Sequence, residues 1–266
     1  MPEISVIMGI YNCADTLREA VGCLQAQTVS DWELLLCDDG STDRTAEVAA
    51  DLAASDARIR LLRNERNLGL PKTLNRCAKE AKGAYLARMD GDDRCAPTRF
   101  EKELAVLREG KFAVVSCGMS FFDEGGTWGE KQYIEYPQKT DFAGNSPFCH
   151  AGAMMRKDAF DAVGGYSEAP DRLRVEDFDL WFRLYQAGYT GCNLQETLYA
   201  MRDDRAAISR KQFRYRINEF HLKKQIAQTF HLGGQARLLA YRPLLLGLCP
   251  AFLYRILHRA KARANR

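Results

Sequence analysis

Residues 4–43 of the chain, ISVIMGIYNCADTLREAVGCLQAQTVSDWELLLCDDGSTD, predict a strand, a helix and a second strand in succession. Two short apolar runs, at residues 4–8 and 32–37, have the length of buried strands. Between them, apolar residues recur at the spacing of one helix face, at Leu17, Ala20, Val21 and Leu24. A strand–helix–strand order is typical of parallel sheets that are covered by helices.

The same alternation continues to residue 89. A second helix is expected from Thr45, then a strand at residues 59–62, a third helix that begins near Pro71, and a fourth strand at residues 84–89. Polar residues just before the first two helices are expected to cap them: Asn12, Asp15, Ser41, Thr42 and Asp43. The chain is therefore predicted to have an α/β fold, with a Rossmann-like, mostly parallel sheet flanked by helices on both faces.

Three polar loops follow strands of this sheet, at residues 9–12, 38–43 and 90–93. Ligands of open α/β sheets bind at the carboxyl ends of strands, so these loops are the candidate site. The third loop holds Asp90, Asp92 and Asp93 within four positions. Two carboxylates about 4 Å apart repel by roughly 4 kcal/mol at an effective dielectric constant near 20. Either a bound cation or plain solvent exposure would offset that repulsion. The glycine-rich fingerprints of dinucleotide and phosphate loops are absent.

Composition limits the class of protein. With 266 residues, 46% of them hydrophobic, the chain can form one large domain, alone or with a smaller appendage. The nine cysteines are scattered without metal-type spacing, which favours reduced thiols in a cytoplasmic protein. No signal-peptide pattern is visible. The longest apolar stretch, residues 244–253, is about half of a membrane span and contains Pro250.

Charge is distributed unevenly along the chain. Residues 202–266 hold 15 Lys/Arg and 3 Asp/Glu, whereas residues 1–201 hold 23 and 32. A basic, partly apolar tail on an acidic body is expected to dock on something anionic, either a membrane face or nucleic acid; the alternative is a solvated basic helix. Nucleic acid would account for the charge but not for the leucines, so a peripheral contact with anionic membrane is preferred and no nucleic acid partner is expected.

Several motifs, taken in order, resemble one known family. The segments ISVIMGIYN, DDGSTDRT, RNLGLPKTLN, ARMDGDD and VEDFDLWFRL are similar to those of the family 2 inverting glycosyltransferases of GT-A fold, over residues 4–201. The tail resembles bacterial members of exopolysaccharide or capsule assembly. The resemblance implies a GT-A catalytic domain at residues 1–201 and a helical, basic C-terminal extension at residues 202–266, for membrane-surface or acceptor docking.

The resemblance assigns nucleotide-sugar contacts to the first two loops. Tyr11 matches the family's base-stacking aromatic residue, and Asp39 matches the acidic residue that accepts a hydrogen bond from the base, with Asp38 orienting the loop. From the residues alone, Tyr11 could instead pack against the sheet edge, and both aspartates could serve only as caps of the next helix.

The third loop matches the family's D-x-D pair. The resemblance implies that Asp92 is a direct ligand of Mg²⁺ or Mn²⁺ and that Asp90 reaches the ribose or the metal's waters, which suits hard cations. Arg88 either contacts phosphate or pairs with a neighbouring carboxylate, and Asp93 is expected to be a structural cap. Many relatives complete the metal shell with an R-x-H segment; here the corresponding residues are Arg202, Asp203 and Asp204.

Asp177 matches the family's general base, which would take the proton of the acceptor hydroxyl. The alternative is that Glu176 and Asp177 only favour a helix N-terminus through its dipole. Glu176 and His150 are candidate acceptor contacts, although His150 could equally be a core residue bonded to backbone.

These inferences predict a metal-dependent glycosyltransferase of the hexosyl-transferring type. It would move a sugar from a nucleotide donor, expected to be a UDP-sugar, to a glycan or polyprenyl-linked acceptor in cell-surface polysaccharide synthesis, on the inner face of the membrane. The rival functions are a sugar-1-phosphate nucleotidyltransferase and a non-enzymatic binding or regulatory protein on the same fold. Residues 121–148 are expected to shape the pocket that selects donor and acceptor.

Overall fold

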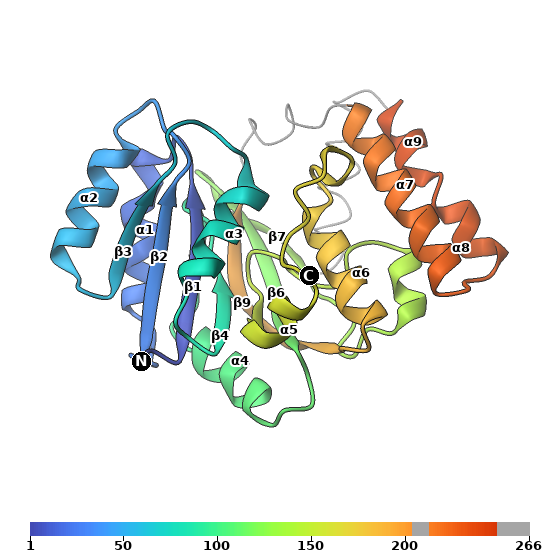
Figure 1. Cartoon of the computed structure of the whole chain (residues 1–266), viewed down its shortest axis with the longest axis horizontal. Coiled ribbons are helices and arrows are strands. Elements are labelled where there is room, and N and C mark those ends of the chain that lie inside the picture. Colours follow the sequence, from blue (N-terminus) through green and yellow to red (C-terminus); the bar gives the residue numbers. More distant parts are fainter. Residues whose placement is uncertain (204–212, 249–266) are drawn as a thin grey trace.

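The computed structural model describes residues 1–203 and 213–248 of the 266-residue chain. Its centre is a sheet in which the described strands follow the order β3-β2-β1-β4-β8-β6-β9-β5, with β7 beside β6 (Figure 1). The strands are β1 Ile4–Ile10, β2 Trp32–Asp38, β3 Ile59–Arg63, β4 Tyr85–Arg88, β5 Arg94–Cys95, β6 Val114–Asp123, β7 Gly126–Lys131, β8 Met154–Arg156 and β9 Gly191–Arg202. The α-helices are α1 Ala14–Gln25, α2 Thr45–Ser55, α3 Leu70–Glu80, α4 Arg99–Arg108, α5 Lys157–Ala162, α6 Glu176–Gln186, α7 Phe213–Thr229, α8 Gly234–Leu239 and α9 Arg242–Gly247, and the 3₁₀ turns are η1 Lys139–Ala143 and η2 Pro170–Arg172.

The first four strands confirm the predicted parallel arrangement. Strand β1 pairs in parallel with β2 and β4, and β2 pairs in parallel with β3. Because β1 and β2 are buried on both faces, they lack the alternation of polar and apolar residues that marks a half-exposed strand. Their carboxyl ends meet at one edge of the sheet, which brings the three polar loops together.

The second half of the sheet is mixed, so the expectation of a mostly parallel sheet is wrong there. Strand β8 runs antiparallel to β4 and β6, β7 is antiparallel to β6, and β5 to β9, whereas β6 and β9 are parallel. Strands β6 and β7 form a hairpin with a turn at residues 124 and 125, and Gly126, which begins β7, has φ 98°. A short turn can only join antiparallel neighbours, whereas parallel strands need a long crossover.

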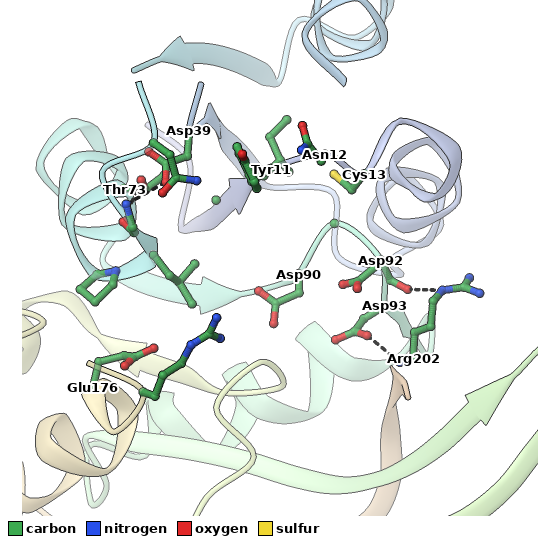
Figure 2. A pocket seen from close by; sticks show the side chains of 18 of the residues that line it. Tyr11, Asn12, Cys13, Asp39, Thr73, Asp90, Asp92, Asp93, Glu176 and Arg202 are labelled. Atoms are coloured by element: carbon green, nitrogen blue, oxygen red, sulfur yellow. Dashed lines mark hydrogen bonds between the residues drawn. The ribbon is translucent and has the colours of Figure 1, made fainter. Parts of the chain in front are cut away.

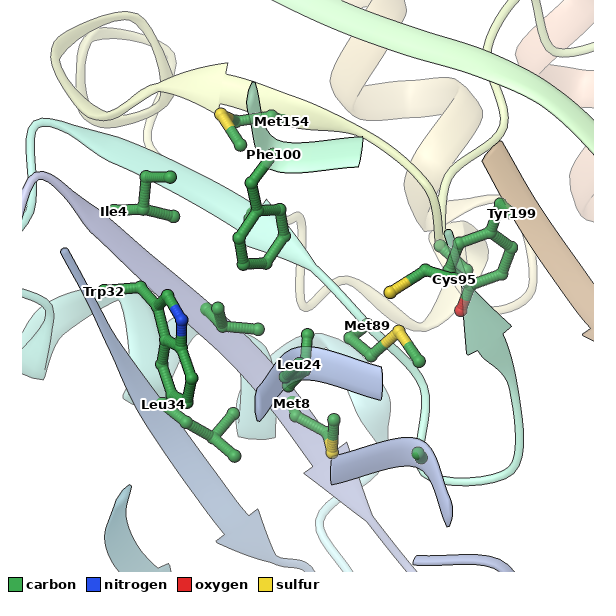
Figure 3. Close-up of a cluster of buried hydrophobic side chains, with 14 of the residues drawn as sticks. Ile4, Met8, Leu24, Trp32, Leu34, Met89, Cys95, Phe100, Met154 and Tyr199 are labelled. Atoms are coloured by element: carbon green, nitrogen blue, oxygen red, sulfur yellow. The ribbon is translucent and has the colours of Figure 1, made fainter. Parts of the chain in front are cut away.

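Helices cover both faces of the sheet, as predicted. Helices α1, α2 and α4 pack against one face and α3, α6 and α7 against the other. Successive strand side chains point to opposite faces: Ile4, Val6 and Met8 belong to the first core and Ile7 to the second. Figure 3 shows the first core, where Phe100 of α4 lies among Ile4, Met154 and Trp32.

The apolar stripes of the helices are confirmed, but their predicted caps are partly wrong. Leu17, Ala20, Val21 and Leu24 are the buried residues of α1. Asn12 adopts φ 50° and lies outside that helix, and its Oδ1 accepts a hydrogen bond from Thr42 N at 2.9 Å. The N–H of Cys13 instead donates to Thr45 Oγ1 at 2.8 Å, so the partner comes from the first residue of α2. Asp43 does cap the second helix, because its Oδ1 accepts the N–H of Thr45 at 2.9 Å.

Helix α7 shares a core with residues that precede position 202. Its Leu222, Ile226 and Ala227 are buried in the cluster that also contains Phe142 and Phe178. Helices α8 and α9 lie on the outer side of α7 (Figure 1). The division of the chain after residue 201 stays a prediction, and part of the predicted apolar and basic tail, residues 249–266, lies outside the described residues. Within the described ranges, no helix combines the length and apolar character needed to cross a membrane.

Candidate functional site

A cavity of about 1060 Å³ opens at the carboxyl ends of the parallel strands (Figure 2). Three of its walls are the loops expected from the sequence: the loop after β1, the loop after β2 and the Asp90–Asp93 loop after β4. The other walls are the residues before α3, the N-terminus of α6, the end of β9 and the first turns of α7. Residues 121–148, expected to shape the pocket, contribute no side chain to this cavity.

Tyr11 is an exposed aromatic residue at the mouth of the cavity. Its side chain is 47% exposed and lines the cavity wall, so it does not bury itself against the sheet edge. The next residue, Asn12, ties this loop to the one after β2, because Asn12 N donates to Ser41 Oγ at 3.1 Å. The two loops therefore hold each other in place, with the Tyr11 ring open to solvent.

Asp39 is buried and organises a neighbouring loop. Its Oδ1 accepts hydrogen bonds from Asn64 Nδ2 at 2.8 Å and Leu68 N at 2.9 Å, and its Oδ2 accepts one from Gly69 N at 2.9 Å. Asp38 Oδ1 accepts the N–H of Ser41 at 3.0 Å, which confirms that Asp38 orients its own loop. Neither carboxylate caps α2, so the alternative of two helix caps is wrong.

Asp93 joins the acidic loop to β9. Its carboxylate is buried and accepts hydrogen bonds from Tyr199 Oη at 2.8 Å and from Arg202 N at 2.7 Å. Burial, together with the charges of Asp90 and Asp92, raises the pKa of Asp93 well above its ordinary value. Asp93 is therefore structural, as expected, but it anchors a strand end and is not a helix cap.

The buried Arg88 side chain pairs with the acidic loop and offsets part of its negative charge. Its side chain is fully buried, and its guanidinium donates to Asp90 Oδ1 at 2.5 Å and to the carbonyl oxygens of Ile7 and Met89 at 3.0 Å. Arg88 was predicted either to contact phosphate or to pair with a carboxylate. In the structure it forms the ion pair, with Asp90, and does not line the cavity. A buried cation thus offsets the negative charge of Asp90 and fixes its orientation.

The donor set at the loop fits a hard divalent cation. Asp90 and Asp92 both line the cavity (Figure 2). Arg88 binds one oxygen of Asp90 from beneath it. Within the described ranges, no cluster of three His, Cys, Asp or Glu residues could hold a metal ion. The described side chains thus supply two carboxylates, which leaves positions for diphosphate oxygens and water, as Mg²⁺ commonly requires.

Arg202, at the end of β9, contacts the acidic loop. Arg202 Nε donates to the carbonyl oxygen of Asp92 at 3.0 Å, and its Nη2 contacts Glu19 at 3.2 Å. The backbone N–H of Asp203 donates to Phe122 O at 3.0 Å. Arg202 is therefore a brace for the acidic loop, and Asp204 lies outside the described residues.

The two acids of α6 face different surroundings. Glu176 is buried and lines the cavity, whereas the half-buried Asp177 does not. Burial, with a smaller effect of the Asp177 charge, raises the pKa of Glu176. Burial also raises the pKa of Asp177, against the opposing effects of the Phe178 N–H and a hydrogen bond from Ser146.

The His150 side chain bonds to another side chain, and not to backbone as one of its two predicted alternatives had it. Its Nε2 lies 2.7 Å from Tyr166 Oη, and its ring packs edge-on against Trp181. Burial lowers the pKa of His150 well below its ordinary value, so the imidazole is neutral. The ring does not line the cavity. Burial raises the pKa of its partner Tyr166, so the phenol is protonated and can donate to His150.

Several residues that line the cavity were not predicted from the sequence, among them Arg174, Tyr215, Arg216 and Glu219. Arg174 adopts φ 67°, a left-handed conformation that is uncommon outside glycine and tends to occur at functional sites. Its guanidinium lies 5.9 Å from the centre of the Tyr215 ring. The nearness of Arg174 to Glu176 in sequence was an available signal, whereas no pattern placed α7 at the cavity.

Comparisons with known proteins agree with this geometry. The model of glycosyl transferase family 2 matches residues 5–164, and that of glycosyl transferase family group 2 matches residues 85–260. The Bacillus subtilis protein EpsE is 40% identical over 98% of this chain and 94% of its own length. The Escherichia coli UDP-Glc:alpha-D-GlcNAc-diphosphoundecaprenol beta-1,3-glucosyltransferase WfaP is 26% identical over 87% of this chain and 89% of its own length.

Among solved structures, S. aureus TarS shares the fold. TarS residues 1–349 in complex with UDP-GlcNAc match with a TM-score of 0.69 and 18% sequence identity, over 93% of this chain and 72% of that one. This chain spans only 43% of a longer TarS structure, which matches with a TM-score of 0.68. At such identity the likeness shows the fold alone.

Proposed function

This chain belongs to glycosyl transferase family 2, and we propose that it transfers a sugar with inversion from a UDP-sugar to a lipid-linked glycan. It is a glycosyltransferase of GT-A fold whose relatives act in the synthesis of cell-surface polysaccharides. One observation carries the finer proposal: a single cavity joins an exposed aromatic ring, Tyr11, to the acidic pair of Asp90 and Asp92. A nucleotide diphosphate needs these two features, a stacking surface for its base and a cation site for its phosphates.

The donor base is proposed to stack on Tyr11 and to be bounded by the loop that Asp39 holds. Asp39 uses three hydrogen bonds on that loop, and Leu68 and Gly69 from it line the cavity. A carboxylate can accept about four hydrogen bonds, so Asp39 retains capacity for one from the base. The diphosphate would then lie toward Asp90 and Asp92.

Asp92 and Asp90 would hold Mn²⁺ or Mg²⁺, whose charge would stabilise the departing diphosphate. The chain adds cations of its own along the cavity: Arg174, Arg202 and Arg216 all line it. Arg88 and Arg202 keep the acidic loop in one conformation, because the first pairs with Asp90 and the second bonds the Asp92 carbonyl. The loop is thus ordered before the donor arrives.

Asp177 is proposed as the general base. As the acceptor oxygen bonds to the anomeric carbon, the bond from that carbon to the phosphate oxygen breaks, and the acceptor proton passes to a carboxylate. Burial raises the Asp177 pKa, which makes its carboxylate a stronger base than an exposed aspartate. Since the base must be ionised, kcat/KM is expected to rise with pH until Asp177 has lost its proton, above the ordinary range for Asp.

A lipid-linked acceptor is supported by the relative whose name includes diphosphoundecaprenol and by the apolar, basic character of the C-terminal helices. Glu176 lines the cavity beside the base and is proposed to contact the acceptor or donor sugar. His150 lies behind Tyr166 and is proposed to position the acceptor side of the site through that phenol.

Two variants test the roles proposed for Asp92, as a metal ligand, and for Asp177, as the general base. Asp92→Asn is expected to abolish the extra thermal stabilisation that Mn²⁺ gives with UDP, because it removes a metal ligand. Asp177→Asn is expected to leave that stabilisation intact and to lower sugar transfer about 10²–10⁴-fold, the usual contribution of a general base. Exposed Asp31→Asn is the control. Transfer at the parental rate by Asp177→Asn would contradict the assignment of the base.

The rival functions lack support from the site. A nucleotidyltransferase would need a glycine-rich, basic phosphate loop after β1, where this chain has Gly9 to Asn12. A purely non-enzymatic binding protein would not need an ordered acidic loop in a nucleotide-sized cavity. Nucleotides that give no metal-dependent thermal stabilisation at all would favour that rival.

A further inference from the structure

An apolar and basic surface covers the two C-terminal helices of the described chain. We name it the α8–α9 face; its members are Arg237, Leu238, Leu239, Tyr241, Arg242, Leu245 and Leu248. Leu238, Leu245 and Leu248 are 73%, 69% and 75% exposed, values that soluble surfaces seldom show for several leucines together. Of the large apolar side chains exposed in the described ranges, five lie within residues 238–248.

The charge of this face has one sign. Residues 233–248 contain Arg237 and Arg242 and no acidic residue. Both arginines are exposed, and neither forms an ion pair within the described part of the chain. The sequence that follows, residues 249–266, adds five further Lys/Arg, again without an acidic residue. Arginines that lie among exposed leucines fit a partner surface that carries anionic groups on the outside and apolar groups beneath them.

We propose that the α8–α9 face docks on the surface of an anionic lipid bilayer. Leucine and tyrosine side chains would enter the boundary between headgroups and acyl chains, and the arginines would meet lipid phosphates. A bilayer fits better than a second copy of the chain that pairs through the same face, because the arginines of the two faces would then repel each other. Helices α8 and α9 are too short to span a membrane, so the contact is superficial.

Helix α7 connects this face with the cavity. Tyr215, Arg216 and Glu219 line the cavity from one side of α7. On the adjoining side of α7 the Phe220 ring lies 4.9 Å from that of Tyr241, and Gly247 of α9 packs closely against Phe213 and Arg216. A lipid-linked acceptor in the membrane would therefore have to pass only α7 to reach the cavity. This statement about the acceptor rests on the proposed function, whereas the docking proposal does not.

Vesicle sedimentation of the full-length chain, without substrates, tests the docking. Binding to vesicles of phosphatidylcholine mixed with phosphatidylglycerol is expected to exceed binding to phosphatidylcholine alone, and to weaken at high salt. The triple variant L238S/L245S/L248S is expected to lose binding by about tenfold or more, because it removes the inserted side chains. R237Q/R242Q is expected to weaken binding and reduce its salt dependence.

Ile134→Ser is the matched control, since Ile134 is an exposed aliphatic residue away from this face. Thermal melts with UDP and Mn²⁺ report the folding and the donor binding of every variant. They test the proposed active site independently of vesicle binding. Parental binding by the triple variant would overturn the proposal, as would the absence of vesicle binding. A parental dimer that the triple variant dissociates, without lipid binding, would show self-association instead and would also overturn it.

Discussion

Asp39 shows how one residue can serve structure and site together. Its two carboxylate oxygens receive three hydrogen bonds from the loop before α3, and that loop forms one wall of the cavity. The family resemblance assigns this position to the nucleobase, but the structure adds that the same carboxylate orders Leu68 and Gly69. A substitution here should therefore affect stability as well as donor binding.

Asp39→Asn is expected to lower the free energy of unfolding by about 1–3 kcal/mol, because an amide NH₂ would face a backbone N–H that loses its acceptor. The dissociation constant for UDP should rise in parallel, as the loop loosens. Chemical denaturation and calorimetric titration measure the two effects. Exposed Asp31→Asn is the control, and unchanged stability of Asp39→Asn would contradict the role given to its hydrogen bonds.

At the scale of an element, α4 carries a buried charge under the sheet. Arg99 and Glu103 are both fully buried, with Arg99 Nε 3.5 Å from a Glu103 oxygen, a distance too long for a good hydrogen bond. Arg99 Nη2 donates to the Arg88 carbonyl oxygen at 2.8 Å, so α4 supports the strand that ends at the acidic loop. Burial raises the pKa of Glu103 to about 8, even though the Arg99 charge opposes the shift.

This raised pKa predicts that stability falls as pH rises between the ordinary value of 4.5 and about 8. Within that window the unfolded chain has released the Glu103 proton and the folded chain retains it, so each pH unit costs up to about 1.4 kcal/mol. Glu103→Gln should show a shallower decline in denaturation experiments. Exposed Glu109→Gln, at the residue that follows α4, is the control, and identical slopes for Glu103→Gln and the parent would contradict the prediction.

At the scale of the whole molecule, the packing of α7 indicates whether the residues after 201 form a separate unit or part of the main core. The helix buries Leu222 and Ile226 against aromatic residues of η1 and α6 and, on another side, lines the cavity. A separate extension would leave the preceding residues stable by themselves. The shared core predicts instead that α7 and the sheet unfold together.

Ile226→Ala is expected to destabilise the chain by about 2–5 kcal/mol, the usual cost of such a cavity in a core. Exposed Ile217→Ala, on the same helix, should have little effect. Thermal unfolding followed by calorimetry measures both. A main transition that Ile226→Ala leaves unchanged, while a minor one shifts, would show that the C-terminal helices form an independent unit.

The sequence by itself determined the first three helices, the four parallel strands and the loops at their carboxyl ends, because these features depend on local periodicity and turn chemistry. It also identified Asp90 and Asp92, which the structure places at the cavity. Tertiary structure decided what no local pattern encodes: that Arg88 pairs with Asp90 inside the protein, that Asp93 anchors β9, and that Glu176 lines the cavity while Asp177 does not. It also brought α7 to the cavity and left the α8–α9 face exposed. These outcomes follow from long-range packing between segments distant in sequence, so only the folded chain could show them.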